Sequence, residues 1–211
     1  MYAIDRVRSV VRSWLKQVAR LINGLSGGRV TPNQITAVST LGHGLVAWAI
    51  YDGRLVWAAI ALVIFGLMDA LDGELARLQK RDSNLGIIFD SVADRVKETL
   101  IYSGIIAYLA PSYSPAALMW VVLALGLSIS LSYIKAKGEA VLASQSDVKI
   151  DPQALNRFTG GDTLMQFDVR MAFIVAGLLF DVLWWMAIAI AIMSIFSISS
   201  RYIELKHLLK K

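Results

Sequence analysis

Long apolar runs separated by short polar connections make up most of this chain. Six apolar segments lie near residues 34–52, 55–79, 86–110, 115–137, 167–181 and 183–202. A helix needs about 20 mainly apolar residues to cross a bilayer. The pattern therefore predicts an all-α integral membrane protein with six transmembrane helices.

The N-terminal stretch MYAIDRVRSVVRSWLKQVARLI has a different pattern, in which basic and apolar residues alternate. At helical spacing one face consists of Ile4, Val7, Val11, Leu15, Val18 and Ile22. This predicts an amphipathic helix on the membrane surface ahead of the six crossings. The alternative is a solvated helix packed on the protein.

Glycine and proline in GGRVTPNQ mark the end of this first helix. We expect an amphipathic juxtamembrane helix and linker over 1–30, one six-helix membrane domain over 31–204 and a basic cytoplasmic tail over 205–211. No internal repeat is visible.

Composition agrees with a membrane protein, since 56% of the residues are hydrophobic and the mean hydropathy is +0.58. The chain has no cysteine, which excludes disulfides and thiolate metal sites. On such a chain the net charge of +5 indicates topology and contact with anionic lipid rather than nucleic acid.

Basic and non-basic connections alternate strictly along the chain. The N-terminal helix, QKRDSN, the 143–162 loop and the tail carry Lys and Arg, whereas YDGR, PSYSP and FDVLWW offer only Arg54. By the positive-inside rule, both termini are cytoplasmic and the number of crossings is even. We expect a multi-pass protein of the cell membrane.

Four aspartates stand at the cytoplasmic ends of the second and third crossings. Asp69 and Asp72 are three residues apart and Asp90 and Asp94 four apart, so each pair shares a helix face. A short turn makes the two helices antiparallel neighbours. Counting from that turn puts Asp69 level with Asp94, and Asp72 level with Asp90.

The same count puts Ala76 level with Gly86, where small residues would let the two backbones approach. Crowded carboxylates need compensating charge, and oxygen ligands without Cys or His favour Mg²⁺, Mn²⁺ or Ca²⁺. Two carboxylates from each helix suit a pair of ions. Ion pairs with nearby arginines, a cation-coupled carrier and a lipid-binding scaffold are the alternatives.

Eight positions then match a known signature. Asp69-x-x-Asp72-Gly73-x-x-Ala76-Arg77, followed after eight residues by Gly86-x-x-x-Asp90-x-x-x-Asp94, resembles that of the CDP-alcohol phosphotransferase (CDP-alcohol phosphatidyltransferase) family. The resemblance implies an enzyme of phospholipid biosynthesis. A phosphatidyl group would pass from a CDP-alcohol, such as CDP-diacylglycerol, to a small polar alcohol, and CMP would leave.

The resemblance also implies roles for these residues at a site facing the cytoplasm. Two Mg²⁺ or Mn²⁺ ions would be held by Asp69, Asp72 and Asp90, with Asp94 as the general base and a further metal contact. The nucleotide would be bound by Asp69, Gly73, Ala76, Arg77 and Gly86. The resemblance also suggests that the protein is a homodimer.

The acceptor is indicated by the end of the fourth crossing. SLSYIKAKGEA is similar to a region of phosphatidylinositol phosphate synthases, which accept inositol 1-phosphate. Lys135, Lys137 and Arg170 would then bind the acceptor phosphate. Ordinary positive-inside anchoring also explains the two lysines, and glycerol 3-phosphate, as in phosphatidylglycerol phosphate synthases, is the competing acceptor.

Overall fold

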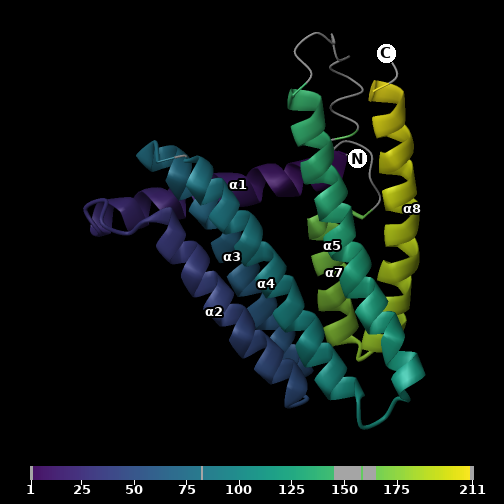
Figure 1. Cartoon of the computed structure of the whole chain (residues 1–211). Helices are drawn as coiled ribbons and strands as arrows, with labels where there is room; N and C mark the ends of the chain where they lie inside the picture. Colours follow the sequence, from purple (N-terminus) through teal and green to yellow (C-terminus); the bar gives the residue numbers. More distant parts are fainter. Residues whose placement is uncertain (1, 82, 145–157, 159–164, 210–211) are drawn as a thin grey trace. The chain divides into compact units, whose positions relative to one another are not determined.

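The computed structural model describes residues 2–81, 83–144, 158 and 165–209, with the side chains of residues 2–9 excepted (Figure 1). The helices of these ranges are α1 (Tyr2–Leu25), α2 (Pro32–Tyr51), α3 (Leu55–Gln79), α4 (Asn84–Leu109), α5 (Pro115–Ala143), α7 (Phe167–Leu179) and α8 (Leu183–Leu209). Each of the six predicted apolar segments corresponds to one of the helices α2, α3, α4, α5, α7 and α8. The all-α prediction is confirmed for the described residues, which form no strand.

Three of the described helices, α3, α5 and α8, are long and apolar enough to cross a membrane. With the apolar α2 and α7, they indicate a multi-pass membrane protein. α7 has 13 residues and is about 20 Å long at the rise of an α-helix. Six full crossings therefore stay a prediction.

Two helix starts follow from local sequence signals. Thr31 caps α2, because its hydroxyl accepts from the amide of Gln34 while its own amide donates to Gln34 Oε1. Pro32 then occupies the first helical turn, where its missing amide hydrogen costs nothing. Ser114 caps α5 by a single hydrogen bond, which its hydroxyl accepts from the amide of Ala117, and Pro115 again occupies the first turn.

The chain divides into two compact units, Met1–Gly104 and Ile105–Lys211, with α4 running from the first into the second. The first unit contains α1, α2, α3 and most of α4. In this unit α1 lies across α3 rather than alongside it (Figure 1).

The apolar face predicted for the N-terminal helix packs against protein. Leu15 and Ala19 are buried against Ile35, Leu71 and Leu75 of the neighbouring helices, and the partly buried side chains beside them include Val11, Val18 and Ile22. Where side chains are described, the face assigned to the bilayer is thus a packing face. Ile4 and Val7 lie outside the described side chains.

A different set of large side chains on α1 is exposed, namely Val10, Trp14, Leu21 and Leu25. They recur at helical spacing, so α1 has a second apolar stripe that the helix α3 does not cover. Because both apolar stripes of α1 repeat at helical spacing, the sequence alone does not show which stripe packs against the protein.

Close helix packing in the first unit depends on glycines of α2 and α4. A Cβ at Gly104 would lie 2.6 Å from the carbonyl oxygen of Ala47, so the backbones of α4 and α2 touch there. Gly42 leaves room for the ring of Phe65 from α3. The contact at Gly104 thus holds α4 close to α2, and the contact at Gly42 holds α2 close to α3.

In the second unit α5, α7 and α8 run side by side (Figure 1). The indole of Trp184 donates to the carbonyl oxygen of Ala117 at 2.9 Å and joins α8 to the start of α5. At the other end of α5, the ring of Phe158 fills the space above Gly138 and packs with Leu142 and Leu208.

Candidate metal and nucleotide site

Three of the four aspartates form a group that could hold a metal ion. Asp69 and Asp72 of α3 and Asp90 of α4 each offer one oxygen, and these three oxygens lie within 4.8 Å of one another. Three carboxylate oxygens suit a hard divalent cation. The arrangement fits Mg²⁺ or Mn²⁺, as expected from the sequence.

Asp72 is buried and has a fixed hydrogen-bond donor. The hydroxyl oxygen of Thr36, in α2, lies 2.5 Å from Asp72 Oδ2 and 3.2 Å from the carbonyl oxygen of Pro32. The shorter contact identifies the carboxylate as the main acceptor. Thr36 therefore orients the carboxylate, and the sequence analysis did not include it.

Asp94 does not belong to the group of three. Its two oxygens are each 3.3 Å from a cation, Oδ1 from Lys97 Nζ and Oδ2 from Arg95 Nη2. The Lys97 ammonium also donates to Asp69 Oδ1. Lys97 is 1% exposed. The sequence analysis did not include it, although its position one helical turn after Asp94 indicated a contact between the two side chains.

The predicted register of the two helices is consistent with these contacts. Lys97 contacts both Asp69 and Asp94, and Asp72 and Asp90 both line one cavity. Each pair of aspartates that the sequence places at the same level thus has a neighbour in common, Lys97 for one pair and the cavity for the other.

A cavity lies beside the aspartates, between α2, α3 and the start of α4. Its lining residues are Pro32, Asn33, Thr36, Asp72, Gly73, Ala76, Arg81, Ser83, Gly86, Ile87 and Asp90. Three positions predicted to bind nucleotide, Gly73, Ala76 and Gly86, are among them. Ala76 and Gly86 thus border a cavity, whereas the sequence predicted that they bring two backbones together.

Packing does not explain the glycine at position 73. A Cβ there would meet only the Arg77 guanidinium, at 3.7 Å, which is an ordinary contact. A Cβ at Gly86 would be tighter, 3.1 Å from the hydroxyl of Ser83. Gly73 therefore leaves a stretch of helix surface open to the cavity, where a ligand can approach the backbone.

Arg77 does not line this cavity. Its guanidinium donates to Glu74 at 2.8 Å, and Arg12 of α1 donates to the same carboxylate at 3.1 Å. Glu74 is 6% exposed, whereas the side chains of Arg77 and Arg12 are more than half exposed. The buried carboxylate thus connects α1 to the helix that carries Asp69 and Asp72.

The predicted acceptor residues lie in the second unit. Arg170, in α7, is 2% exposed, and its guanidinium donates to the carbonyl oxygen of Met165 at 3.1 Å and to Ser132 Oγ at 3.4 Å. Lys135 is half-buried and Lys137 is exposed, both in α5. The structure gives neither lysine a hydrogen bond or ion pair within the described ranges.

A second buried guanidinium in this unit was missed. Arg201 of α8 is 4% exposed, and its Nε and Nη1 have no hydrogen-bond partner among the described residues. Arg170, Glu139 and Glu204 are close enough to act on it electrostatically. The available signal was its place inside the predicted apolar segment 183–202, because a charged residue in such a segment usually has a partner or a function.

Comparison with known proteins agrees with this site. The model of the CDP-alcohol phosphatidyltransferase family matches residues 29–192, which include the four aspartates and the cavity-lining residues. The chain belongs to the CDP-alcohol phosphatidyltransferase family, whose members are transferases that depend on divalent metal ions.

One similar protein is a phosphatidylinositol phosphate synthase of Corynebacterium glutamicum, 37% identical over 129 residues. The match covers 60% of this chain and 58% of that relative, so this chain spans little more than half of the relative's length.

Solved structures of a phosphatidylinositol phosphate synthase from Mycobacterium tuberculosis have the same fold. The form with CDP-diacylglycerol bound has a TM-score of 0.73 at 21% identity, covering 90% of this chain and 92% of that one. The form in complex with manganese and citrate has a TM-score of 0.73 at 20% identity, over 90% and 88% of the two chains.

Proposed function

We propose that this protein transfers a phosphatidyl group from a CDP-alcohol, such as CDP-diacylglycerol, to a phosphorylated polar alcohol and releases CMP. The observation that carries the proposal is the group of three aspartate oxygens within 4.8 Å of one another, beside a cavity lined by Gly73, Ala76 and Gly86. The relatives' names, and the CDP-diacylglycerol complex of one of them, support this donor.

Asp69, Asp72 and Asp90 would hold the metal ions, Mg²⁺ or Mn²⁺, with two ions in the complete site. Bound there, the ions would neutralise charge on the donor pyrophosphate. Gly73, Ala76 and Gly86 would line the nucleotide pocket together with Asn33, Arg81 and Ser83 of the same cavity. Asp69 would take part in metal binding and in nucleotide binding. Arg77 lies outside the cavity, so its part in nucleotide binding would be indirect, through its hydrogen bond to Glu74.

Asp94 would be the general base and would take the proton from the acceptor hydroxyl. Its carboxylate is 21% exposed and is held between Lys97 and Arg95. Contacts to two cations hold such a carboxylate in a fixed orientation, which a base requires before the acceptor arrives.

The acceptor would carry a phosphate. The supporting observation is the buried guanidinium of Arg201, whose Nε and Nη1 have no hydrogen-bond partner among the described residues and could donate to a phosphate. Lys135 and Lys137 would add positive charge at the same end of α5. Inositol 1-phosphate is the preferred acceptor, because the relatives are phosphatidylinositol phosphate synthases. Glycerol 3-phosphate is the alternative.

The proposal includes a membrane setting. We propose six crossings in one membrane domain over 31–204, with the juxtamembrane helix of 1–30 before it and the basic tail of 205–211 after it. Both termini and the aspartates would face the cytoplasm, in the cell membrane, and the enzyme would be a homodimer.

The test is an assay of the purified protein in lipid nanodiscs with CDP-diacylglycerol and Mn²⁺. Inositol 1-phosphate, glycerol 3-phosphate and unphosphorylated inositol are supplied in turn, and CMP and the lipid product are measured. We expect CMP release with inositol 1-phosphate and none with inositol. Release with glycerol 3-phosphate alone would move the assignment to that acceptor.

Two variants separate the enzyme from a carrier or a scaffold. Asp94→Asn should lower the rate by about 10²–10⁴-fold, the usual contribution of a general base. Asp52→Asn, at an exposed turn of the same unit, should leave the rate unchanged. Ion flux in proteoliposomes without CMP release would support the cation-coupled carrier instead.

A further inference from the structure

Lys97 occupies an unusual position for a lysine, inside a group of carboxylates that binds metal in the proposed function. Its side chain is 2% exposed, and its ammonium contacts Asp69 Oδ1 and Asp94 Oδ1. A lysine buried to this extent needs compensating negative charge, and these two aspartates supply it. Lys97 is therefore an internal cation of the group.

The ammonium shares Asp69 with the proposed metal site. Asp69 accepts from Lys97 through Oδ1 and also offers one oxygen to the group formed with Asp72 and Asp90. Within the described ranges Lys97 has no ion pair with Asp72 or Asp90, so an ion bound mainly by those two carboxylates would leave Lys97 in place. An ion held by Asp69 and Asp94 would need the position of the ammonium, because Nζ contacts both carboxylates.

We infer that Lys97 stands in for one of the two cations until the donor binds. Without the donor, one divalent ion would bind at Asp69, Asp72 and Asp90, and Lys97 would compensate Asp94. The second ion would enter with the donor, whose pyrophosphate adds negative charge and oxygen ligands. Repulsion between the fixed ammonium and a dication keeps that ion weakly bound before then.

This inference rests on the proposed function, and Mn²⁺ binding without any substrate tests it. The purified protein in nanodiscs is titrated with Mn²⁺, and free Mn²⁺ is followed by electron paramagnetic resonance. For the wild type we expect about one ion bound tightly per chain and a second at least about tenfold weaker. In Lys97→Met, we expect the second ion to bind at least about tenfold more tightly and a spin–spin coupled signal to appear.

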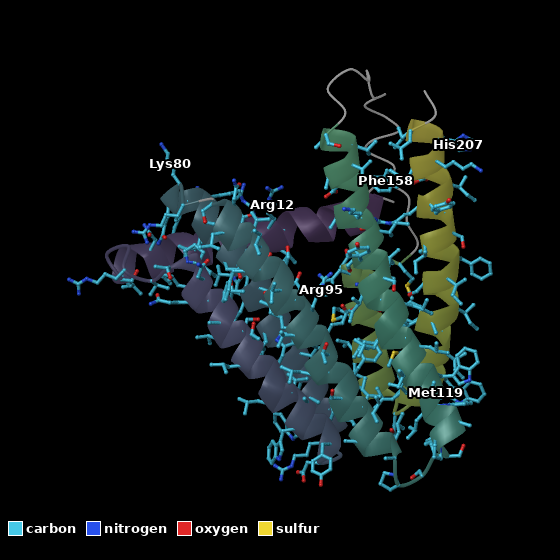
Figure 2. All side chains as sticks on the ribbon, in the orientation of Figure 1. Arg12, Lys80, Arg95, Met119, Phe158 and His207 are labelled. Atoms are coloured by element: carbon cyan, nitrogen blue, oxygen red, sulfur yellow. The ribbon has the colours of Figure 1, made fainter. Side chains whose placement is uncertain are left out.

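Matched variants make the result specific. Lys80→Met removes a lysine that extends from the exposed end of α3 (Figure 2), and it should titrate like the wild type. Lys97→Arg keeps the charge and should also keep the second site weak. Size-exclusion profiles and unfolding temperatures show whether each variant is folded.

The outcomes distinguish this inference from the proposed function. Two ions of equal affinity in the wild type, a result that needs no variant, would overturn the role of Lys97. An unchanged titration of folded Lys97→Met would also overturn it and leave only a structural ion pair. Asp72→Asn should abolish the tight ion, and if it does not, the proposed metal site itself is wrong.

Discussion

Thr36 Oγ1 lies 2.5 Å from Asp72 Oδ2, and both residues are buried although they are 36 positions apart in the chain. The contact joins the second helix to the proposed metal ligand. Removing the hydroxyl in Thr36→Val keeps the shape of the side chain but leaves the carboxylate free to turn. We expect Mn²⁺ affinity to fall by about 10–100-fold, as is typical when a partner of a metal ligand is lost.

The measurement is the Mn²⁺ dissociation constant of the folded variant. Thr40→Val is the matched control, because the bond that its hydroxyl makes among the described residues is to the carbonyl oxygen of Thr36, within the same helix. Equal loss of affinity in both variants would show that the effect comes from helix α2 in general and not from the contact with Asp72.

Glu74 holds α1 on α3 through Arg12, and also binds Arg77. Glu74→Gln removes the charge that two guanidiniums share, and hydrogen bonds to charged groups contribute about 1.5–3 kcal/mol each. We expect a lower unfolding temperature and faster tryptic cleavage at the basic residues of α1.

The control is Asp52→Asn, which breaks an exposed ion pair with Arg54. It should lower the free energy of unfolding by at most about 1 kcal/mol.

Arg201→Met should affect substrate binding more than stability. The substitution removes a buried guanidinium that has no hydrogen bond at Nε or Nη1 within the described residues. The free protein should lose little stability, since these two nitrogens are buried without the hydrogen bonds that would offset their desolvation. The KM for a phosphorylated acceptor should rise, while the KM for the CDP-alcohol stays constant.

This prediction is checked by unfolding temperature and by separate KM values for the two substrates. A large loss of stability with an unchanged acceptor KM would assign Arg201 to the packing of α8. Arg170→Met is the companion variant, although it also removes hydrogen bonds to Met165 and Ser132 and should therefore lose stability.

Gly104 should be the least replaceable glycine of the first unit. In Gly104→Ala the new Cβ would lie 2.6 Å from a backbone oxygen of α2, and backbone gives way less easily than a side chain. We expect a cost of about 1–3 kcal/mol in the free energy of unfolding. Gly44→Ala, where nothing lies within 4 Å, should be neutral or stabilising.

Much of the fold and of the candidate site follows from local patterns in the sequence. The apolar periods locate each helix of the described residues to within a few residues at most ends, although α5 and α8 run about six residues further than their apolar segments. The spacing of Asp69, Asp72, Asp90 and Asp94 puts each pair on one face, because a helix repeats every 3.6 residues. Those facts need no tertiary information.

Contacts between distant segments needed the structure. Thr36 looks like an ordinary residue of an apolar helix, and Lys97 like a single charge in the middle of another, until their contacts with Asp72 and Asp69 of α3 are seen. The first helix likewise offers two apolar stripes, and only packing shows that Leu15 and Ala19 are the buried ones.

The sequence by itself determined the family signature, the helices and the four aspartates, since these depend on residues close together in the chain. The tertiary structure decided which aspartates form a group, that Lys97 separates Asp94 from it, and that Arg77 lies outside the cavity. The physical reason is that a side chain's neighbours across a helix interface depend on rotation and separation of whole helices, which no local period encodes.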